Sequence, residues 1–222
     1  MSYTSDWLDD PLIKFNIHTI QWTYLKPKKV DTKDWKWISF HFATRLKLEG
    51  AIYFCRQLLG AASLNQDMGL YLLAHRQRGW YAAAFFFELC SAYDTLLQEL
   101  NIIYGLDLDV EKVKWNTIKK YDLPQPLANI MERDQETDWF KKVRRYRNTA
   151  THHMLIPMEE WTTAQTQHTW DAKVTRIMIS YRDEKNDVIE EEIHICEEYL
   201  IKMIEHIRNV WNEMRKEFNQ DD

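Results

Sequence analysis

Arginine, asparagine and histidine side chains that could act on a phosphate gather in residues 137–153 of this 222-residue sequence. Arg147 and Asn148 are followed at short spacing by the pair His152 and His153. A planar guanidinium binds a phosphate through parallel N–H groups, and an imidazole takes up and releases protons near neutral pH. These residue types predict a site that holds a phosphate and moves protons at it.

Four further cations crowd the same segment and extend its positive charge. The net charge of the chain is −5, which argues against a general nucleic-acid coat, but the local charge matters more than the total. We expect these side chains to attract a phosphate backbone and to give binding that weakens with salt. The predicted binding cations are Lys141, Lys142, Arg144 and Arg145.

The geometry of a helix limits how the two main groups can cooperate. The apolar residues of the segment predict an amphipathic helix over residues 136–151. Five residues of helix turn the chain by about 500°, so Arg147 and His152 would point about 140° apart on a regular helix. They can meet one phosphate if the helix ends or bends near Ala150, or if a second subunit supplies half of the site.

Two long helices are predicted to come before the basic one, at residues 35–64 and 70–104. In the first helix, the residues that we expect to point inward are Trp35, Ile38, Phe42, Leu46, Ile52, Cys55 and Leu59. The second helix carries Trp80 and Phe87 on a separate apolar side, which predicts a place in the middle of a bundle or a contact with a second subunit. Its main stripe steps by four and three residues through Ala82, Phe86, Leu89, Tyr93, Leu96, Leu100 and Ile103.

The remaining segments complete a predicted all-α fold. Short helices are expected at residues 110–120 and from residue 124, and a last helix at residues 196–218. A β-hairpin insertion is expected at residues 172–194, and an N-terminal arm at residues 1–30. Few glycines and prolines and no internal repeat fit one domain over residues 1–222. The prediction is an antiparallel bundle of about five helices with a small β-hairpin before the last helix.

The helical order and the segment RNTATH resemble the HEPN superfamily. Its signature is an arginine, four to six residues and then a histidine, often with a polar residue directly after the arginine. Arg147, Asn148 and His152 match it, and His153 fits the longer spacing equally well. Some toxin members carry a tyrosine two residues after the histidine as a modification target, where this chain has Met154.

The resemblance implies a homodimer whose two motifs line a shared cleft, and metal-independent cleavage of RNA by a toxin or antiviral defence effector. His152 or His153 would transfer the proton, Arg147 would stabilise the phosphorus centre, and Asn148 would orient a phosphate oxygen or the imidazole. A regulatory protein such as an antitoxin would be a further partner. The alternative is a non-catalytic dimeric module that binds RNA, a nucleotide or a protein partner.

Two carboxylates of the second long helix are candidate supporting groups. Glu88 interrupts the apolar run AAAFFFELC, and it is either a polar helix edge or a buried carboxylate that orients a catalytic histidine or arginine. Asp94 is nearer the second apolar side and would project toward a subunit boundary.

No metal or cofactor is expected. Glu191-x-x-His194 has the spacing of a di-iron ligand pair, but it occurs once and within a predicted strand. The sequence contains no phosphate-binding glycine loop and no nucleophile elbow. The three cysteines are far apart, the first residues do not resemble a signal peptide, and no apolar run is long enough to span a membrane. These features predict a cytoplasmic protein with buried free thiols.

Overall fold

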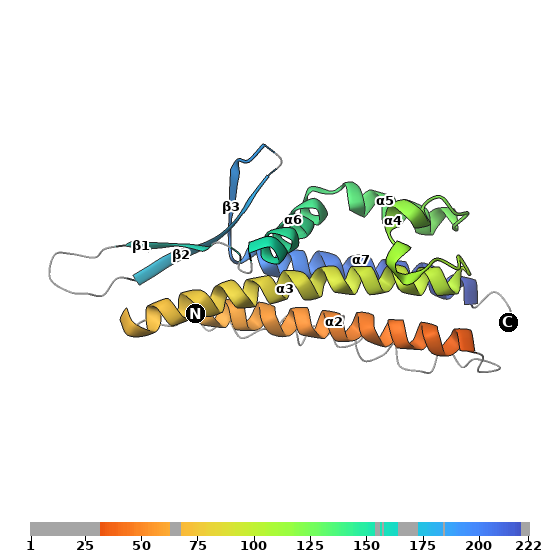
Figure 1. Ribbon diagram of the computed structural model, residues 1–222, viewed down its shortest axis with the longest axis horizontal. Helices are drawn as coiled ribbons and strands as arrows, with labels where there is room; N and C mark the ends of the chain where they lie inside the picture. Colours follow the sequence, from red (N-terminus) through yellow and green to blue (C-terminus); the bar gives the residue numbers. More distant parts are fainter. Residues whose placement is uncertain are drawn as a thin grey trace. The chain divides into compact units, whose positions relative to one another are not determined.

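The computed structural model describes residues 32–62, 68–153, 156, 158–163, 173–183 and 185–218 of the chain. This part contains six α-helices and a small sheet before the last helix, so the predicted helical bundle with a β-hairpin is confirmed. The predicted N-terminal arm lies outside the described residues. The elements in chain order are α2 (Thr32–Ala62), α3 (Met68–Ile103), the 3-10 helix η1 (Val110–Lys112), α4 (Trp115–Ile118), α5 (Gln125–Glu136), α6 (Asp138–His153), β1 (Met158–Thr163), β2 (Lys173–Arg182), β3 (Val188–Glu192) and α7 (Ile195–Phe218) (Figure 1).

The chain divides into two compact units. Among the described residues, unit 1 contains 32–45, 93–134 and 203–218, and unit 2 contains those of 46–92 and 135–202. Because α2, α3 and α7 each run through both units, neither unit is a continuous piece of the chain. A single domain over residues 1–222 remains a prediction.

The apolar stripe predicted for α3 is buried. Phe86, Leu89, Leu96 and Leu100 are each 0% exposed, as expected for residues on one side of a packed helix. The helix ends at Ile103, and Gly105 shortly beyond it has a positive φ of 59°. The amide of the next residue, Leu106, donates to the Asn101 carbonyl at 3.0 Å. Glycine adopts this left-handed conformation without strain, so the sequence stops α3 here.

Side-chain contacts in unit 2 set the direction of α2 against α3. Lys47 pairs with Glu88 at 3.0 Å, and the ring of Phe54 lies 6.5 Å from that of Tyr81. Moving forward along α2 therefore means moving backward along α3, so the two helices are antiparallel, as predicted.

In unit 1, α7 follows α3 in the same direction. The ring of His206 lies 5.7 Å from that of Tyr93, and the indole nitrogen of Trp211 donates to Glu99 at 3.1 Å. The residue that comes later on α3 contacts the residue that comes later on α7, so the two helices are parallel. His41 of α2 lies against both Glu99 and Trp211, so the three helices share a core in this unit.

The sheet has three strands in the order β1-β2-β3, and both pairings are antiparallel. The hairpin β2-β3 was predicted from its β-branched residues and the turn between them. Asn186, with a φ of 68°, makes that turn, in which Asp183 accepts two backbone amides. Strand β1 was not predicted, and it pairs Met158 with Ile179 on the far edge of β2.

The expectation that Phe42 and Leu46 point inward is wrong. Phe42 is 55% exposed and Leu46 48% exposed, whereas Ile52 and Cys55, which were also expected to point inward, are buried. This helix has apolar residues on two sides, so apolar type alone identified its core side only in part. Among the described side chains of unit 2, large exposed apolar residues include Trp80 and Phe87 of α3, which we call the exposed apolar face.

Candidate functional site

Helix α6 carries the Arg–His motif and packs through one apolar side. Phe140, Val143 and Tyr146 recur every third residue and are at most 2% exposed. The Tyr146 ring stacks on Phe86 of α3 at 4.5 Å, and the Cys90 thiol donates to the Val143 carbonyl at 3.9 Å. These contacts hold α6 against α3 and leave the polar residues of α6 around its remaining surface.

The motif lies on an uninterrupted helix. Because α6 continues to His153, it neither ends nor breaks near Ala150, and Arg147 and His152 point about 140° apart. Arg147 is half-buried, and its Nε is buried with no acceptor among the described residues, whereas Asn148 and His152 are exposed. Of the two arrangements left open by the sequence, a helix end or bend near Ala150 is not seen, and a site shared with a second subunit stays a prediction.

His153 is the last residue of α6, and its side chain lies outside the description. A choice between His152 and His153 as the proton-transfer group therefore stays a prediction. Thr151, which directly precedes His152, donates its hydroxyl to the Arg147 carbonyl at 2.9 Å, a common local bond in helices.

The four predicted binding cations divide into two pairs. Lys141 and Arg144 are exposed. The Lys141 ammonium lies 3.2 Å from Glu136, and the Arg144 guanidinium lies 5.9 Å from the Phe140 ring. The second pair, Lys142 and Arg145, is half-buried, and the charged groups of both are engaged within the protein.

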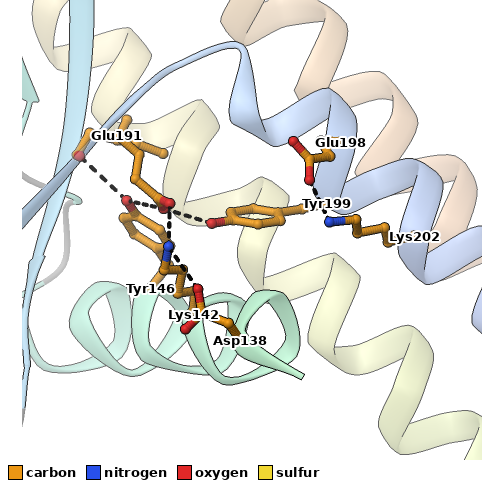
Figure 2. Close-up of polar contacts among 8 residues, drawn as sticks. Asp138, Lys142, Tyr146, Glu191, Glu198, Tyr199 and Lys202 are labelled. Atoms are coloured by element: carbon orange, nitrogen blue, oxygen red, sulfur yellow. Dashed lines mark hydrogen bonds and ion pairs between the residues drawn. The ribbon is translucent and has the colours of Figure 1, made fainter. Parts of the chain in front are cut away.

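A carboxylate on β3 gathers three donors from α6 and α7 (Figure 2). One oxygen of Glu191 accepts the hydroxyls of Tyr199 at 2.7 Å and Tyr146 at 3.0 Å. The other oxygen accepts the Lys142 ammonium at 2.9 Å, and this ammonium also lies 3.0 Å from Asp138. Lys142 thus lies between two carboxylates, and we call these five residues the Glu191 cluster.

The cluster fixes the protonation of its lysine and its two tyrosines. Its hydrogen bond to Glu191 raises the pKa of the Lys142 ammonium above the usual range, despite partial burial. Burial raises the pKa of the Tyr146 and Tyr199 hydroxyls, and the negative charge of Glu191 raises both further. At neutral pH the lysine is charged and both tyrosines are neutral donors.

The two candidate supporting carboxylates of α3 have different surroundings. Glu88 is 20% exposed and pairs with Lys47 of α2 at 3.0 Å, so its partner is neither a histidine nor an arginine of the motif. Asp94 is exposed. A supporting role of either carboxylate at the motif stays a prediction.

Comparison with known families identifies the chain. The family model of the Cthe2314-like HEPN domains matches residues 52–215. The chain belongs to this HEPN family. The match spans α3, α6 and α7 and therefore includes the motif. No curated protein and no solved structure matches the chain.

The sequence did not identify Glu191 and Tyr199 as important residues of this HEPN chain. Glu191 was considered as a metal ligand with His194, but His194 is 58% exposed and Glu191 is turned toward the two tyrosines. The sequence did contain an indication of this role. Glu191 and Ile189 are two positions apart on β3, so their side chains lie on the same, less exposed side of the strand, where an apolar residue is usual.

Metal-ligand groups and membrane-spanning helices can be assessed for the described residues. No group of three or more His, Cys, Asp or Glu side chains is placed there so that it could hold a metal ion. Likewise, none of the helices in that part of the chain combines the length and the apolar character needed to cross a membrane.

Proposed function

We propose that this HEPN chain is a metal-independent endoribonuclease, with a site completed by two copies of α6. The observation that carries the proposal is the motif itself: Arg147, Asn148 and His152 occur on an uninterrupted helix of a family commonly found in ribonucleases and toxins. The buried Nε of Arg147, which has no acceptor in the described part of the chain, supports a ligand or partner that supplies one.

The chemistry needs no metal ion or cofactor. The ribose 2′-oxygen attacks the adjacent phosphorus, the bond to the 5′-oxygen breaks, and the products are a cyclic phosphate and a 5′-hydroxyl. A histidine takes the proton of the 2′-hydroxyl or supplies one to the leaving oxygen, which contributes about 10²–10⁴-fold to the rate. The Arg147 guanidinium stabilises the charge that accumulates on the phosphate oxygens. Asn148 orients a phosphate oxygen or the imidazole.

Two copies are required because one helix directs its arginine and histidine to different sides. In the composite site, Arg147 of one copy faces His152 of the other. The exposed apolar face supports such pairing, since Trp80 and Phe87 recur seven residues apart on α3, a spacing suited to another helix. This face borders α6: Phe87 directly follows Phe86, which stacks on α6, and precedes Cys90, which bonds to it.

Lys141 and Arg144 are the cations best suited to guide RNA to the site, because both are exposed beside the motif. Lys142 contributes through Glu191 instead. A nuclease of this kind would act as a toxin or defence effector, and a regulatory protein such as an antitoxin would be needed to restrain it.

The test is cleavage of unstructured RNA in the presence of EDTA. We expect wild-type protein to cleave, and His152→Ala and Arg147→Ala each to lose at least about 100-fold in kcat. His153→Ala identifies the proton-transfer group if His152→Ala remains active. His194→Ala is the matched control, because His194 is exposed and lies on no part of α6.

Mixing the two inactive variants tests the composite site. If each site takes Arg147 from one copy and His152 from the other, a mixed dimer of Arg147→Ala and His152→Ala has one intact site. Random exchange then restores about a quarter of the wild-type activity. A mixture that stays inactive although the copies exchange would contradict the shared site. RNA binding without cleavage by wild-type protein would favour the non-catalytic module.

A further inference from the structure

The Glu191 cluster joins three elements of unit 2 through one side chain. Glu191 is on β3, Lys142 and Tyr146 are on α6, and Tyr199 is on α7 (Figure 2). The Glu191 side chain is 14% exposed, and both tyrosines are at most 2% exposed. Hydrogen bonds to an ionised carboxylate in such a site are short and strong, so the cluster is a rigid junction.

Two of the three groups that donate to Glu191 lie on one side of α6. Lys142 and Tyr146 are one turn apart on α6 and therefore lie on the same side of it. Tyr146 also donates to the Ile179 carbonyl of β2 at 3.4 Å, which adds a second point of attachment to the sheet. Two anchors on one side oppose both rotation of the helix about its axis and sliding along it.

The apolar contacts of α6 do not provide the same restraint. Phe140 and Val143 are buried, but apolar packing has no preferred direction and tolerates small rotations. Hydrogen bonds weaken steeply when their angles are distorted. Arg147 directly follows Tyr146, so any rotation that strains the Tyr146 hydroxyl bond also changes where Arg147 points.

We infer that Glu191 is a positioning residue, which sets the rotation of α6 and thereby the direction of Arg147 toward RNA and the second copy. The role in catalysis rests on the proposed function, whereas the restraint on α6 does not. The β2-β3 hairpin then has a defined purpose in this chain: it carries the carboxylate that holds the motif helix.

The test compares Glu191→Ala with Glu191→Gln, which keeps the length of the side chain and an acceptor oxygen. Hydrogen exchange of the α6 amides measures the restraint without any need for cleavage. We expect exchange in α6 to accelerate about tenfold in Glu191→Ala and to be intermediate in Glu191→Gln, whose single amide oxygen can still accept the two tyrosine hydroxyls. Glu190→Ala is the matched control, because Glu190 is an exposed neighbour on the same strand.

Cleavage kinetics provide the second measurement, at a temperature where every variant is folded. Misplacing Arg147 should lower kcat at least about tenfold in Glu191→Ala and change KM less than about twofold, because the exposed cations still bind RNA. Glu191→Gln should restore kcat in part, to the same degree as it restores the protection of α6 from exchange, which a general loss of stability would not predict. If Glu191→Ala does not fold, Tyr199→Phe removes one donor and should change both readouts in the same direction.

Unchanged α6 exchange in a folded Glu191→Ala protein would overturn the positioning role. So would a kcat that falls only in proportion to the unfolded fraction. If the wild-type protein cleaves no RNA, the proposed function fails, and the exchange data still decide whether Glu191 holds α6.

Discussion

Two carboxylates, Glu99 in unit 1 and Glu191 in unit 2, each hold three elements together but with different partners. Glu99, on α3, is 0% exposed and accepts from His41 at 2.9 Å, Thr44 at 2.5 Å and Trp211 at 3.1 Å. Glu191 is slightly exposed and binds a lysine and two tyrosines.

The difference between them concerns which helix is held. The partners of Glu99 lie on α2 and α7, so this cluster ties together helices that form the bundle core. The partners of Glu191 include two residues of α6, where the motif is found. Similar chemistry therefore serves stability in unit 1 and the placement of a candidate active site in unit 2. This contrast predicts that the two carboxylates respond differently to substitution.

The largest expected effect on stability is that of Glu99→Ala. Removing this carboxylate leaves the Trp211 indole and the His41 ring nitrogen without their acceptor, whereas the Thr44 hydroxyl keeps the Phe40 carbonyl at 3.0 Å. The two unsatisfied groups should cost about 2–5 kcal/mol of unfolding free energy. Urea unfolding measures the loss. Glu111→Ala is the control, because Glu111 is exposed on η1 and should leave the midpoint unchanged.

Glu191→Ala should destabilise the protein less than Glu99→Ala, because two of its three donors keep another acceptor. Lys142 keeps Asp138 at 3.0 Å, and Tyr146 keeps the Ile179 carbonyl at 3.4 Å. A greater loss for Glu191→Ala than for Glu99→Ala would break the comparison. It would mean that the Glu191 cluster is the main structural tie of the chain rather than a device for placing α6.

The same contrast explains what the sequence could predict. The stripe of Leu89, Leu96 and Leu100 depends on neighbours three and four positions apart, so local spacing was sufficient to locate α3 and its buried side. The hairpin β2-β3 is equally local. Strand β1 was missed because Met158 pairs with Ile179 across a long connection.

The candidate site was predicted from residue type and not from geometry. Arg147 and His152 were chosen for their chemistry, yet their separation around the helix depends on where α6 ends. Glu191 was missed because its donors, Lys142 and Tyr146, are far from it in sequence and meet it only after the sheet has formed. Long-range pairing of this kind leaves no periodic pattern to read.

Acid pH offers a smaller, independent test of the difference between the units. Asp134 in unit 1 is buried, which alone would raise its pKa, but hydrogen bonds from His206 and Arg133 hold its pKa at about 2, below the ordinary 3.8. A depressed pKa stabilises the folded state above pH 3.8, and this contribution is lost as the pH falls toward 2. The exposed Arg133 is screened by solvent, so we expect about 1–2 kcal/mol.

Urea unfolding from pH 5 to pH 2 should therefore show a shallower acid loss in Asp134→Asn than in the wild type. Tyr199→Phe is the contrasting variant from unit 2. The pKa of Tyr199 is raised, so its contribution is lost at alkaline pH, above its ordinary pKa of about 10, and the acid slope should not change. Equal acid slopes in Asp134→Asn and wild type would contradict the assignment to Asp134.

The smallest effect is expected where a carboxylate has a single flexible partner. A methyl group added at Gly50 of α2 would lie 3.2 Å from Glu88 Cγ and 3.3 Å from its Cδ and Oε2. Because Glu88 is partly exposed and bonded to the mobile Lys47, it can move by a few tenths of an ångström at little cost. The gain from replacing glycine inside a helix is about 0.5–1 kcal/mol, so Gly50→Ala should be weakly stabilising.

Gly60→Ala is the matched case on the same helix, since no atom lies within 4 Å of its added methyl group. A double-mutant cycle with Glu88→Ala isolates the contact: Gly50→Ala should gain more in that background, and Gly60→Ala should not. If Gly50→Ala instead destabilises the protein by more than about 1 kcal/mol, Glu88 is held as rigidly as Glu191. Rigid anchoring would then be common to carboxylates of unit 2 and would no longer single out the one that holds the motif helix.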